Sequence, residues 1–144
     1  MGLLDTFKSR FAAATEALRS QEKQLILIID DDVQNVTMLR ANLENEGYRV
    51  DIATDGATGG QKAAQLKPHL IITDVFMPDV DGLSMIEDIR EKYLDLAHVP
   101  VIFMSGRAME NFLPETDDPS LKLALMRKPI FLPELNTLVR KFLA

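Results

Sequence analysis

Polar side chains stand directly after four separate apolar runs in this sequence of 144 residues. In chain order they are Asp30 and Asp31, then Asp74, then Ser105, and finally Lys128. Crowded carboxylates resist ionisation unless a cation balances them, and Mg²⁺ prefers oxygen ligands of this kind. A lysine ammonium can pair with a phosphate, and a serine hydroxyl can donate to a phosphate oxygen. If these side chains meet, they can stabilise a phosphoryl group on or near a carboxylate, which is itself a phosphoryl acceptor.

Each of these residues also has an ordinary structural explanation. An acidic run after a strand often serves as a helix cap, and we expect Asp32 to cap the helix that follows it. Lys128 and Pro129 could form a turn and nothing more. A functional site is favoured because all four groups follow successive predicted strands, an arrangement that chance seldom produces.

The apolar pattern from Leu25 onward predicts strands that alternate with helices. The strands are predicted over 25–29, 48–53, 70–73, 99–104 and 123–127, and the helices over 33–46, 57–66, 83–93 and 133–142. Such alternation implies a mostly parallel five-stranded sheet with helices on both faces. Because sites of open parallel sheets lie at the carboxyl ends of the strands, the polar groups should share one edge. Two prolines between 107 and 122 predict that any helix there is short or broken.

Residues 1–24 are predicted to form an extension to a domain that spans residues 25–144. An apolar residue recurs every three or four positions, which predicts one stripe on an amphipathic helix: Leu4, Phe7, Phe11, Ala14 and Leu18. A helix this short is marginal in water by itself. It should therefore pack on its own domain, on a second copy of the chain to form a homodimer, or on a partner. The polar segment 20–24 is predicted to be a linker.

The composition excludes several classes of protein. Sixteen basic residues against twenty-two acidic ones give a net charge of −6, which argues against a general binder of nucleic acid or anionic membranes. The absence of cysteine excludes a disulfide framework and a thiol nucleophile. No apolar run approaches the roughly 20 residues of a membrane span. The N-terminus lacks the pattern of a secretory signal, so we expect a cytoplasmic protein.

Four segments resemble the receiver domain of two-component response regulators. They are LILIIDDD at 25–32, LIITDVFMPDVDG at 70–82, PVIFMSG at 100–106 and RKPI at 127–130. They occur in the order and at the spacing of that family, over about 120 residues from Gln24 to Ala144. The resemblance implies a flavodoxin-like, doubly wound fold. It also implies a signalling protein rather than an enzyme.

The resemblance implies a role for most of the polar residues. Asp74 would accept a phosphoryl group from a histidine kinase or a phosphotransfer protein. Asp30 and Asp31 would hold Mg²⁺ together with Asp74 and the backbone carbonyl of Phe76. Lys128 would contact the phosphate.

Other positions concern the response to phosphorylation. Ser105 would move to bond the phosphate and couple it to a surface formed by the fourth and fifth helices and the last strand. The Lys128–Pro129 bond is expected to be cis. Leu125 stands where the family usually has an aromatic residue that reports phosphorylation, so switching is expected to rely on other packing. Phe76 and Arg107 occupy positions that tune the phosphate lifetime in the family. The resemblance does not indicate whether these two side chains lengthen or shorten it.

Two hypotheses about function follow, and both can hold. In the first, the chain is a stand-alone phosphoacceptor that signals through a downstream protein partner or a phosphorelay. In the alternative, it is a non-phosphorylated docking or dimerisation module that uses the N-terminal helix. The irregular 107–122 segment favours the alternative slightly, whereas the intact acceptor set disfavours it. A third hypothesis is a phosphatase that acts on small substrates. It predicts multiple turnovers on an added phosphate ester, and we expect no such turnover.

Overall fold

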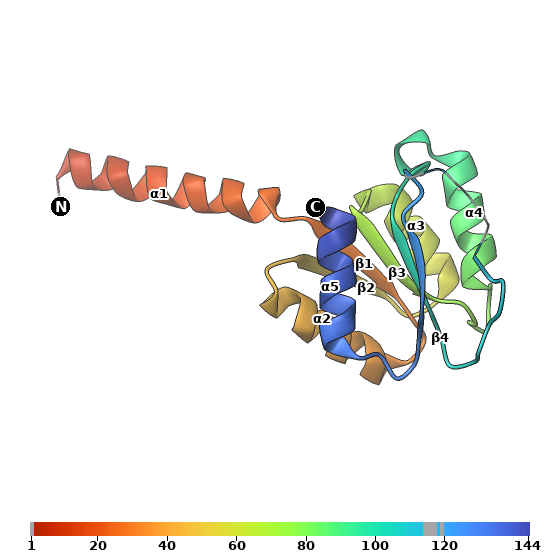
Figure 1. The fold of residues 1–144 in the computed structure, drawn as a ribbon. Helices are drawn as coiled ribbons and strands as arrows, with labels where there is room; N and C mark the ends of the chain where they lie inside the picture. Colours follow the sequence, from red (N-terminus) through yellow and green to blue (C-terminus); the bar gives the residue numbers. More distant parts are fainter. Residues whose placement is uncertain (1, 114–117, 119) are drawn as a thin grey trace.

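The computed structural model of this chain describes residues 2–113, 118 and 120–144. In this described part, five parallel strands form one sheet in the order β2-β1-β3-β4-β5 (Figure 1). The strands are β1 (Leu25–Ile29), β2 (Arg49–Ala53), β3 (Leu70–Asp74), β4 (Val101–Ser105) and β5 (Leu123–Arg127). The predicted doubly wound parallel sheet is confirmed, because helices cover both of its faces.

The helices form two layers, with one additional helix at the N-terminus. They are α1 (Leu3–Glu22), α2 (Val33–Asn45), α3 (Gly56–Leu66), α4 (Gly82–Lys92), the short 3-10 helix η1 (Leu94–Leu96) and α5 (Leu132–Leu143). α2 and α5 cover one face of the sheet, and α3 and α4 cover the other (Figure 1). β4 begins two residues later than predicted, because Pro100 has no N–H to donate to a neighbouring strand.

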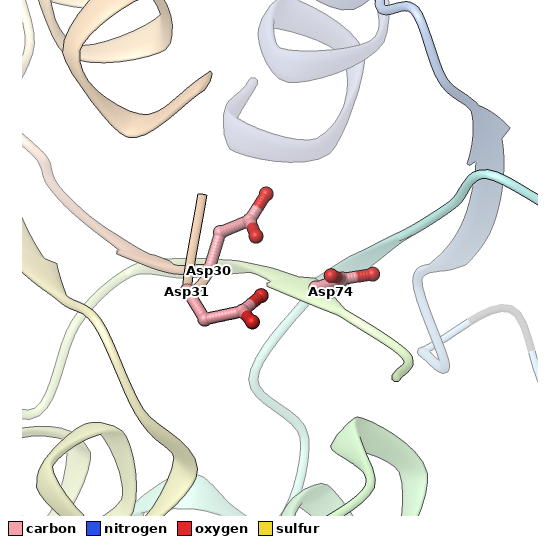
Figure 2. Close-up of side chains that lie close together, drawn as sticks. All are labelled: Asp30, Asp31 and Asp74. Carbon is pink, nitrogen blue, oxygen red and sulfur yellow. The ribbon is translucent and has the colours of Figure 1, made fainter. Parts of the chain in front are cut away.

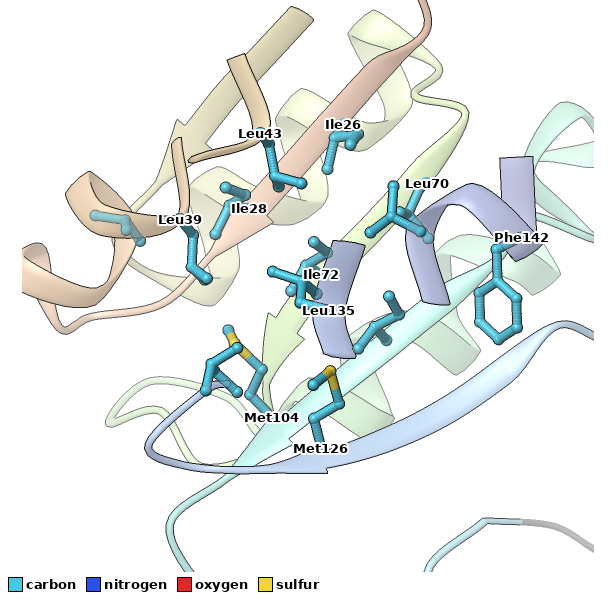
Figure 3. Packing of buried hydrophobic residues seen from close by; sticks show 14 residues of the cluster. Ile26, Ile28, Leu39, Leu43, Leu70, Ile72, Met104, Met126, Leu135 and Phe142 are labelled. Atoms are coloured by element: carbon cyan, nitrogen blue, oxygen red, sulfur yellow. The ribbon is translucent and has the colours of Figure 1, made fainter. Parts of the chain in front are cut away.

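Strand β1 is buried along its whole length, as its uninterrupted aliphatic sequence predicts. Ile26 and Ile28 face α2 and α5, whereas Leu27 and Ile29 face α3 and α4. Figure 3 shows the first of these faces, where side chains from the sheet pack against α2 and α5. Burial on both sides holds β1 in the interior of the sheet, between β2 and β3, and it thereby fixes the position of the acidic residues that follow β1.

The order of the strands reverses beside β1. The chain passes from β1 to β2 on one side and then crosses to β3 on the other side. The loops after β1 and β3 therefore leave the sheet in opposite directions and open a crevice between them. Asp30 and Asp31 follow β1 at this crevice, and Asp74 is the last residue of β3.

Helix α2 begins where the sequence predicts. The side chain of Asp32 accepts hydrogen bonds from the backbone N–H groups of Gln34 and Asn35, at 3.0 and 3.2 Å, which confirms Asp32 as the N-cap. The carboxylate of Asp32 is therefore used to cap α2. Of the three consecutive aspartates, Asp30 and Asp31 remain for a site.

The connection from β4 to β5 contains no helix in its described residues, which are 106–113, 118 and 120–122. Asn111 has a φ of 56°, a left-handed conformation that does not continue a helix. Pro114 and Pro119, on which the prediction of a short or broken helix depends, lie outside the described residues. The described residues of this connection are therefore irregular, and residues 128–131 lead from β5 to α5.

Helix α1 points away from the rest of the molecule (Figure 1). Leu4, Phe7 and Phe11 remain 63%, 65% and 66% exposed. Packing of the stripe on its own domain, one of the three alternatives that the sequence left open, is therefore not seen for these side chains. The other two alternatives, a second copy of the chain and a partner, stay open.

The predicted linker over 20–24 is wrong for its first three residues, because α1 continues to Glu22. Only Lys23 and Gln24 separate α1 from β1. No helix in the part of the chain that the structure describes is long and apolar enough to cross a membrane.

Candidate functional site

Three carboxylates meet at the crevice between the ends of β1 and β3 (Figure 2). Asp30, Asp31 and Asp74 each bring an oxygen atom to within 4.8 Å of the other two. Asp30 and Asp74 are buried, whereas Asp31 is exposed. The convergence that the strand order requires is therefore present, and one side of the cluster is open to water.

The carboxylate of Asp30 is held by donors on both oxygen atoms. Oδ2 lies 2.8 Å from Nζ of Lys128 and accepts a hydrogen bond of 2.7 Å from Nδ2 of Asn35. Oδ1 accepts a bond of 3.0 Å from the backbone N–H of Asp32. Burial raises the pKa of Asp30, but the bonds from Lys128, Asp32 and Asn35 outweigh it and lower the pKa overall. Asp30 is therefore an anion with a fixed orientation.

Lys128 links the end of β5 to the ends of three other strands. It follows β5, and its Nζ donates to Oδ2 of Asp74 at 3.2 Å as well as contacting Asp30. Its backbone N–H donates to the carbonyl of Ser105 at the end of β4, at 2.8 Å. Burial lowers the pKa of Lys128, but Asp30 and Asp74 more than offset this and raise it. The predicted cis bond between Lys128 and Pro129 is confirmed.

Asp74 is less well compensated than Asp30. Burial and the charge of Asp30 raise the pKa of Asp74, while Lys128 and the backbone N–H of Phe76 act in the opposite direction without cancelling the rise. Three carboxylates against one ammonium leave negative charge without a partner in this cluster.

This donor set fits Mg²⁺. Its oxygen ligands are hard, they converge from two strand ends, and the exposed side at Asp31 leaves room for the water molecules that Mg²⁺ retains. A zinc or copper site would instead favour imidazole or thiolate ligands, and Asp30, Asp31 and Asp74 supply only carboxylates. The contribution of the Phe76 carbonyl stays a prediction.

The hydroxyl of Ser105 is engaged locally. Ser105 is 1% exposed, and its Oγ donates to the carbonyl of Arg107 and accepts from the N–H of the same residue, both at 3.0 Å. Ser105 thus lies at the end of β4, as predicted, but its hydroxyl is bonded to Arg107 in the loop that follows. A bond from Ser105 to a group on Asp74 would require the hydroxyl to leave the Arg107 carbonyl.

Phe76 and Arg107 connect the loops that follow β3 and β4. The guanidinium carbon of Arg107 lies 4.5 Å from the centre of the Phe76 ring, a cation–π contact, and Phe76 is 42% exposed. Leu125 is partly buried and packs with the cluster between the sheet and α3 and α4. An aromatic pair lies in the same cluster, Phe103 with Phe112, at 5.1 Å and edge to face.

Three residues that support the site were not predicted from the sequence as site residues. Asn35 orients Asp30, and the hydroxyl of Thr73 donates to the carbonyl of Asp74 at 3.0 Å. Asp79, in the loop after β3, accepts from the N–H groups of Gly56 and Ala57 at the start of α3. The available signal for Asn35 was its position in the first turn of α2, three residues after the N-cap. Nothing in the local sequence of Asp79 indicates its partner.

The family model for the response regulator receiver domain matches residues 26–140 of this chain. Among curated proteins, the chain is 34% identical over 123 residues to the alkaline phosphatase synthesis transcriptional regulatory protein PhoP of Bacillus subtilis, covering 82% of this chain and 48% of that protein. It is 35% identical over 126 residues to the sensor protein EvgS of Escherichia coli O157:H7, covering 88% of this chain and 10% of that protein. The chain thus spans about half or less of the length of these relatives.

Solved structures give the same result for the fold. A two-component response regulator from Clostridium difficile superposes with a TM-score of 0.72 at 26% identity, over 84% of this chain and 96% of that one. A CheY-like response regulator receiver domain protein from Methanospirillum hungatei superposes with a TM-score of 0.72 at 24% identity, over 85% and 94% of the two chains.

Proposed function

The chain belongs to the response regulator receiver domain family, and from this premise we propose that Asp74 accepts a phosphoryl group and thereby changes the affinity of the domain for a protein partner. The observation that carries the proposal is the bridge that Lys128 makes between Asp30 and Asp74 beside the open acidic cluster. Such a cluster offers a nucleophilic oxygen, a fixed cation and space for a divalent ion in one crevice.

The proposed reaction transfers one phosphoryl group from a phosphohistidine of a kinase or phosphotransfer protein. A carboxylate oxygen of Asp74 attacks the phosphorus atom, the P–N bond breaks, and its electron pair stays on the imidazole nitrogen. The product is an acyl phosphate, and Nζ of Lys128 donates to one of its phosphate oxygens. Bound Mg²⁺ would neutralise charge on the transferred group, held by Asp30, Asp31 and Asp74 with the carbonyl of Phe76.

The proposed response begins at Ser105. Its hydroxyl exchanges the carbonyl of Arg107 for a phosphate oxygen, which pulls on the segment between β4 and β5. The exposed surface of β5 and α5 then changes its affinity for a downstream protein, as a population shift between two states. Phe76 and Arg107 lie in the loops beside Asp74 and contact each other. We propose that they tune the phosphate lifetime. We expect this signalling to take place in the cytoplasm.

The test of the proposed function is phosphorylation by a small donor. Incubation with acetyl phosphate and Mg²⁺, followed by intact mass spectrometry, should add one phosphoryl group to the wild type and none to Asp74→Asn. Asp95→Asn is the matched control, because Asp95 is an exposed aspartate outside the site that pairs only with the exposed Lys67 in the described chain. An unmodified wild type, or a phosphoryl group that persists in Asp74→Asn, would contradict the proposal.

A second role, which can coexist with the first, is favoured by the exposed stripe of α1. The positions Leu4, Phe7, Phe11, Ala14 and Leu18 are separated by three, four, three and four residues, the spacing of a two-stranded coiled-coil seam. Phe7 and Phe11 stack on the exposed side of the helix, with ring centres 6.4 Å apart. We therefore propose that α1 pairs with α1 of a second copy.

Sedimentation equilibrium tests the pairing of α1. The full-length chain should sediment as a dimer, and a chain that starts at Gln24 should sediment as a monomer that still accepts a phosphoryl group. Phe7→Asp should give the monomer without truncation, because it places a charge in the seam. A full-length chain that remains monomeric at every concentration tested would reject the pairing.

A further inference from the structure

The loop between β3 and α4 folds back on itself, and its two ends are bonded together. The N–H of Gly82 donates to the carbonyl of Val75 at 2.7 Å, and the N–H of Val75 donates to the carbonyl of Met104 on β4 at 2.9 Å. Residues 76–81 therefore form one closed loop beside the carboxylate cluster. Phe76, whose carbonyl we propose as a ligand of Mg²⁺, is the first residue of that loop.

Asp79, in the second half of this loop, binds the first turn of α3. Its Oδ1 accepts from the N–H of Gly56 at 3.1 Å, and its Oδ2 accepts from the N–H of Ala57 at 2.9 Å. The bonds from Gly56 and Ala57 favour the carboxylate and lower the pKa of Asp79. A Cβ on Gly56 would overlap the side chain of Val80, so the loop and the helix are also in direct contact.

Two carboxylates share the N–H groups at the start of α3. Asp55, the N-cap, accepts from the N–H of Thr58 at 2.7 Å, and Asp79 accepts from the two residues before Thr58. The first N–H groups of a helix have no partner within the helix, so each of these bonds stabilises the start of α3. Because Asp79 comes from another part of the chain, its bonds also restrain the loop after β3, which the bond of Asp55 does not.

Met77 restrains the same loop by packing. It is 9% exposed and lies in the apolar cluster between the sheet and α3 and α4. Met77 and Asp79 therefore hold the loop toward the same face of the sheet, one on each side of Pro78. The ends and the middle of the loop are all held, which limits the orientations open to the backbone of Phe76.

We propose that Asp79 is a positioning residue for the divalent ion: by holding the loop against α3, it keeps the carbonyl of Phe76 in place beside the three carboxylates. This inference rests on the proposed function, in which that carbonyl is a ligand of Mg²⁺. Removing a residue that orients a metal ligand commonly weakens metal binding by about 10- to 100-fold. Loss of Asp79 should therefore weaken the binding of the ion although every ligand is still present.

The experiment measures the dissociation constant of Mn²⁺, a paramagnetic substitute for Mg²⁺, with the full-length protein, by EPR of the free ion. Asp79→Ala is expected to bind Mn²⁺ about tenfold more weakly than the wild type. Asp79→Asn keeps the size of the side chain but only one of its two acceptor oxygens, so its affinity should lie between the two. Asp31→Asn removes a proposed ligand and should also weaken binding, which locates the ion at the carboxylate cluster.

Asp55→Ala is the matched control for Asp79→Ala. It removes one negative charge and one cap from the same end of α3, but it leaves the bonds between Asp79 and α3 in place. Its affinity for Mn²⁺ should equal that of the wild type. Equal losses of affinity in Asp79→Ala and Asp55→Ala would show that the charge or the helix start is responsible, and they would overturn the inference. An unchanged affinity in Asp79→Ala would overturn it as well.

Phosphorylation by acetyl phosphate separates this inference from the proposed function. The rate of mass gain in Asp79→Ala should fall at low Mg²⁺ and recover at saturating Mg²⁺, since Asp74 and Lys128 are unchanged. A rate that stays low at saturating Mg²⁺ would contradict the positioning role, and so would a wild type that binds no Mn²⁺. A wild type that binds Mn²⁺ but gains no phosphoryl group would reject the proposed function, while the Mn²⁺ affinities would still decide the role of Asp79.

Discussion

Lys128→Met is expected to lower the free energy of unfolding by roughly 3 kcal/mol, at the lower end of the usual cost of breaking a buried ion pair. Lys128 is the cation that contacts both Asp30 and Asp74, at 2.8 and 3.2 Å. Without it, two buried carboxylates face each other and the exposed Asp31. The lower end of the range applies because the lysine side chain retains 21% exposure. Urea unfolding in the absence of divalent ions measures the change.

Mg²⁺ provides a second measurement on the same variant. A ligand that binds only the folded state stabilises it in proportion to its affinity and concentration. Because Lys128→Met leaves more uncompensated negative charge, added Mg²⁺ should stabilise the variant more than it stabilises the wild type. Phosphorylation by acetyl phosphate should be strongly reduced in the variant, since Asp74 loses the group that we propose donates to the phosphate.

Lys92→Met is the control for the loss of a lysine charge. Lys92 pairs with Asp88 on the exposed side of α4, with both side chains more than half exposed. Exposed pairs of this kind contribute little, so no measurable change in stability is expected. If Lys128→Met behaved like Lys92→Met, with unchanged stability and an unchanged effect of Mg²⁺, Lys128 would not be the structural counter-ion of the site.

Gly82→Ala is expected to lower the free energy of unfolding by about 3 kcal/mol, the upper part of the usual range for overpacking. A Cβ at Gly82 would overlap the backbone oxygen of Asp74 and crowd its carbonyl carbon and the hydroxyl of Thr73. The N–H of Gly82 also donates to the carbonyl of Val75 at 2.7 Å, which brings the start of α4 against the end of β3. The backbone of Asp74 cannot rotate away as a flexible side chain would.

The same substitution should also impair the site. Any movement that relieves the overlap displaces Asp74 from Lys128, so the rate of phosphorylation by acetyl phosphate should fall together with stability. Gly106→Ala is the matched control, since a Cβ there would meet nothing within 4 Å. Chemical denaturation and the rate of mass gain should be normal in Gly106→Ala. Normal values in Gly82→Ala would show that the loop after β3 adapts without cost.

The sequence predicted the elements of the domain because their causes are local. An uninterrupted aliphatic run in β1 predicted a strand buried on both faces. The side chain of Asp32 predicted the start of α2, and both were confirmed. Helix α1 was also predicted from its apolar spacing. Its extent to Glu22 was not predicted, because a short polar sequence is equally typical of an exposed helix end and of a linker.

The sequence also placed Asp30, Asp31, Asp74 and Lys128 at strand ends, and parallel pairing then requires these ends to share an edge. What it could not supply were the contacts between residues far apart in the chain. The spacing of residues does not show that Lys128 lies closer to Asp30 than to Asp74, nor that Ser105 is bonded to Arg107.

Only the tertiary structure decided the remaining features. The support of Asp30 by Asn35 and the exposed stripe of α1 depend on how separate elements pack. Periodicity and capping act within a few residues and can be read along the chain. Hydrogen-bond partners and cavities arise where separate elements meet, and their geometry is set by the packing of the whole domain.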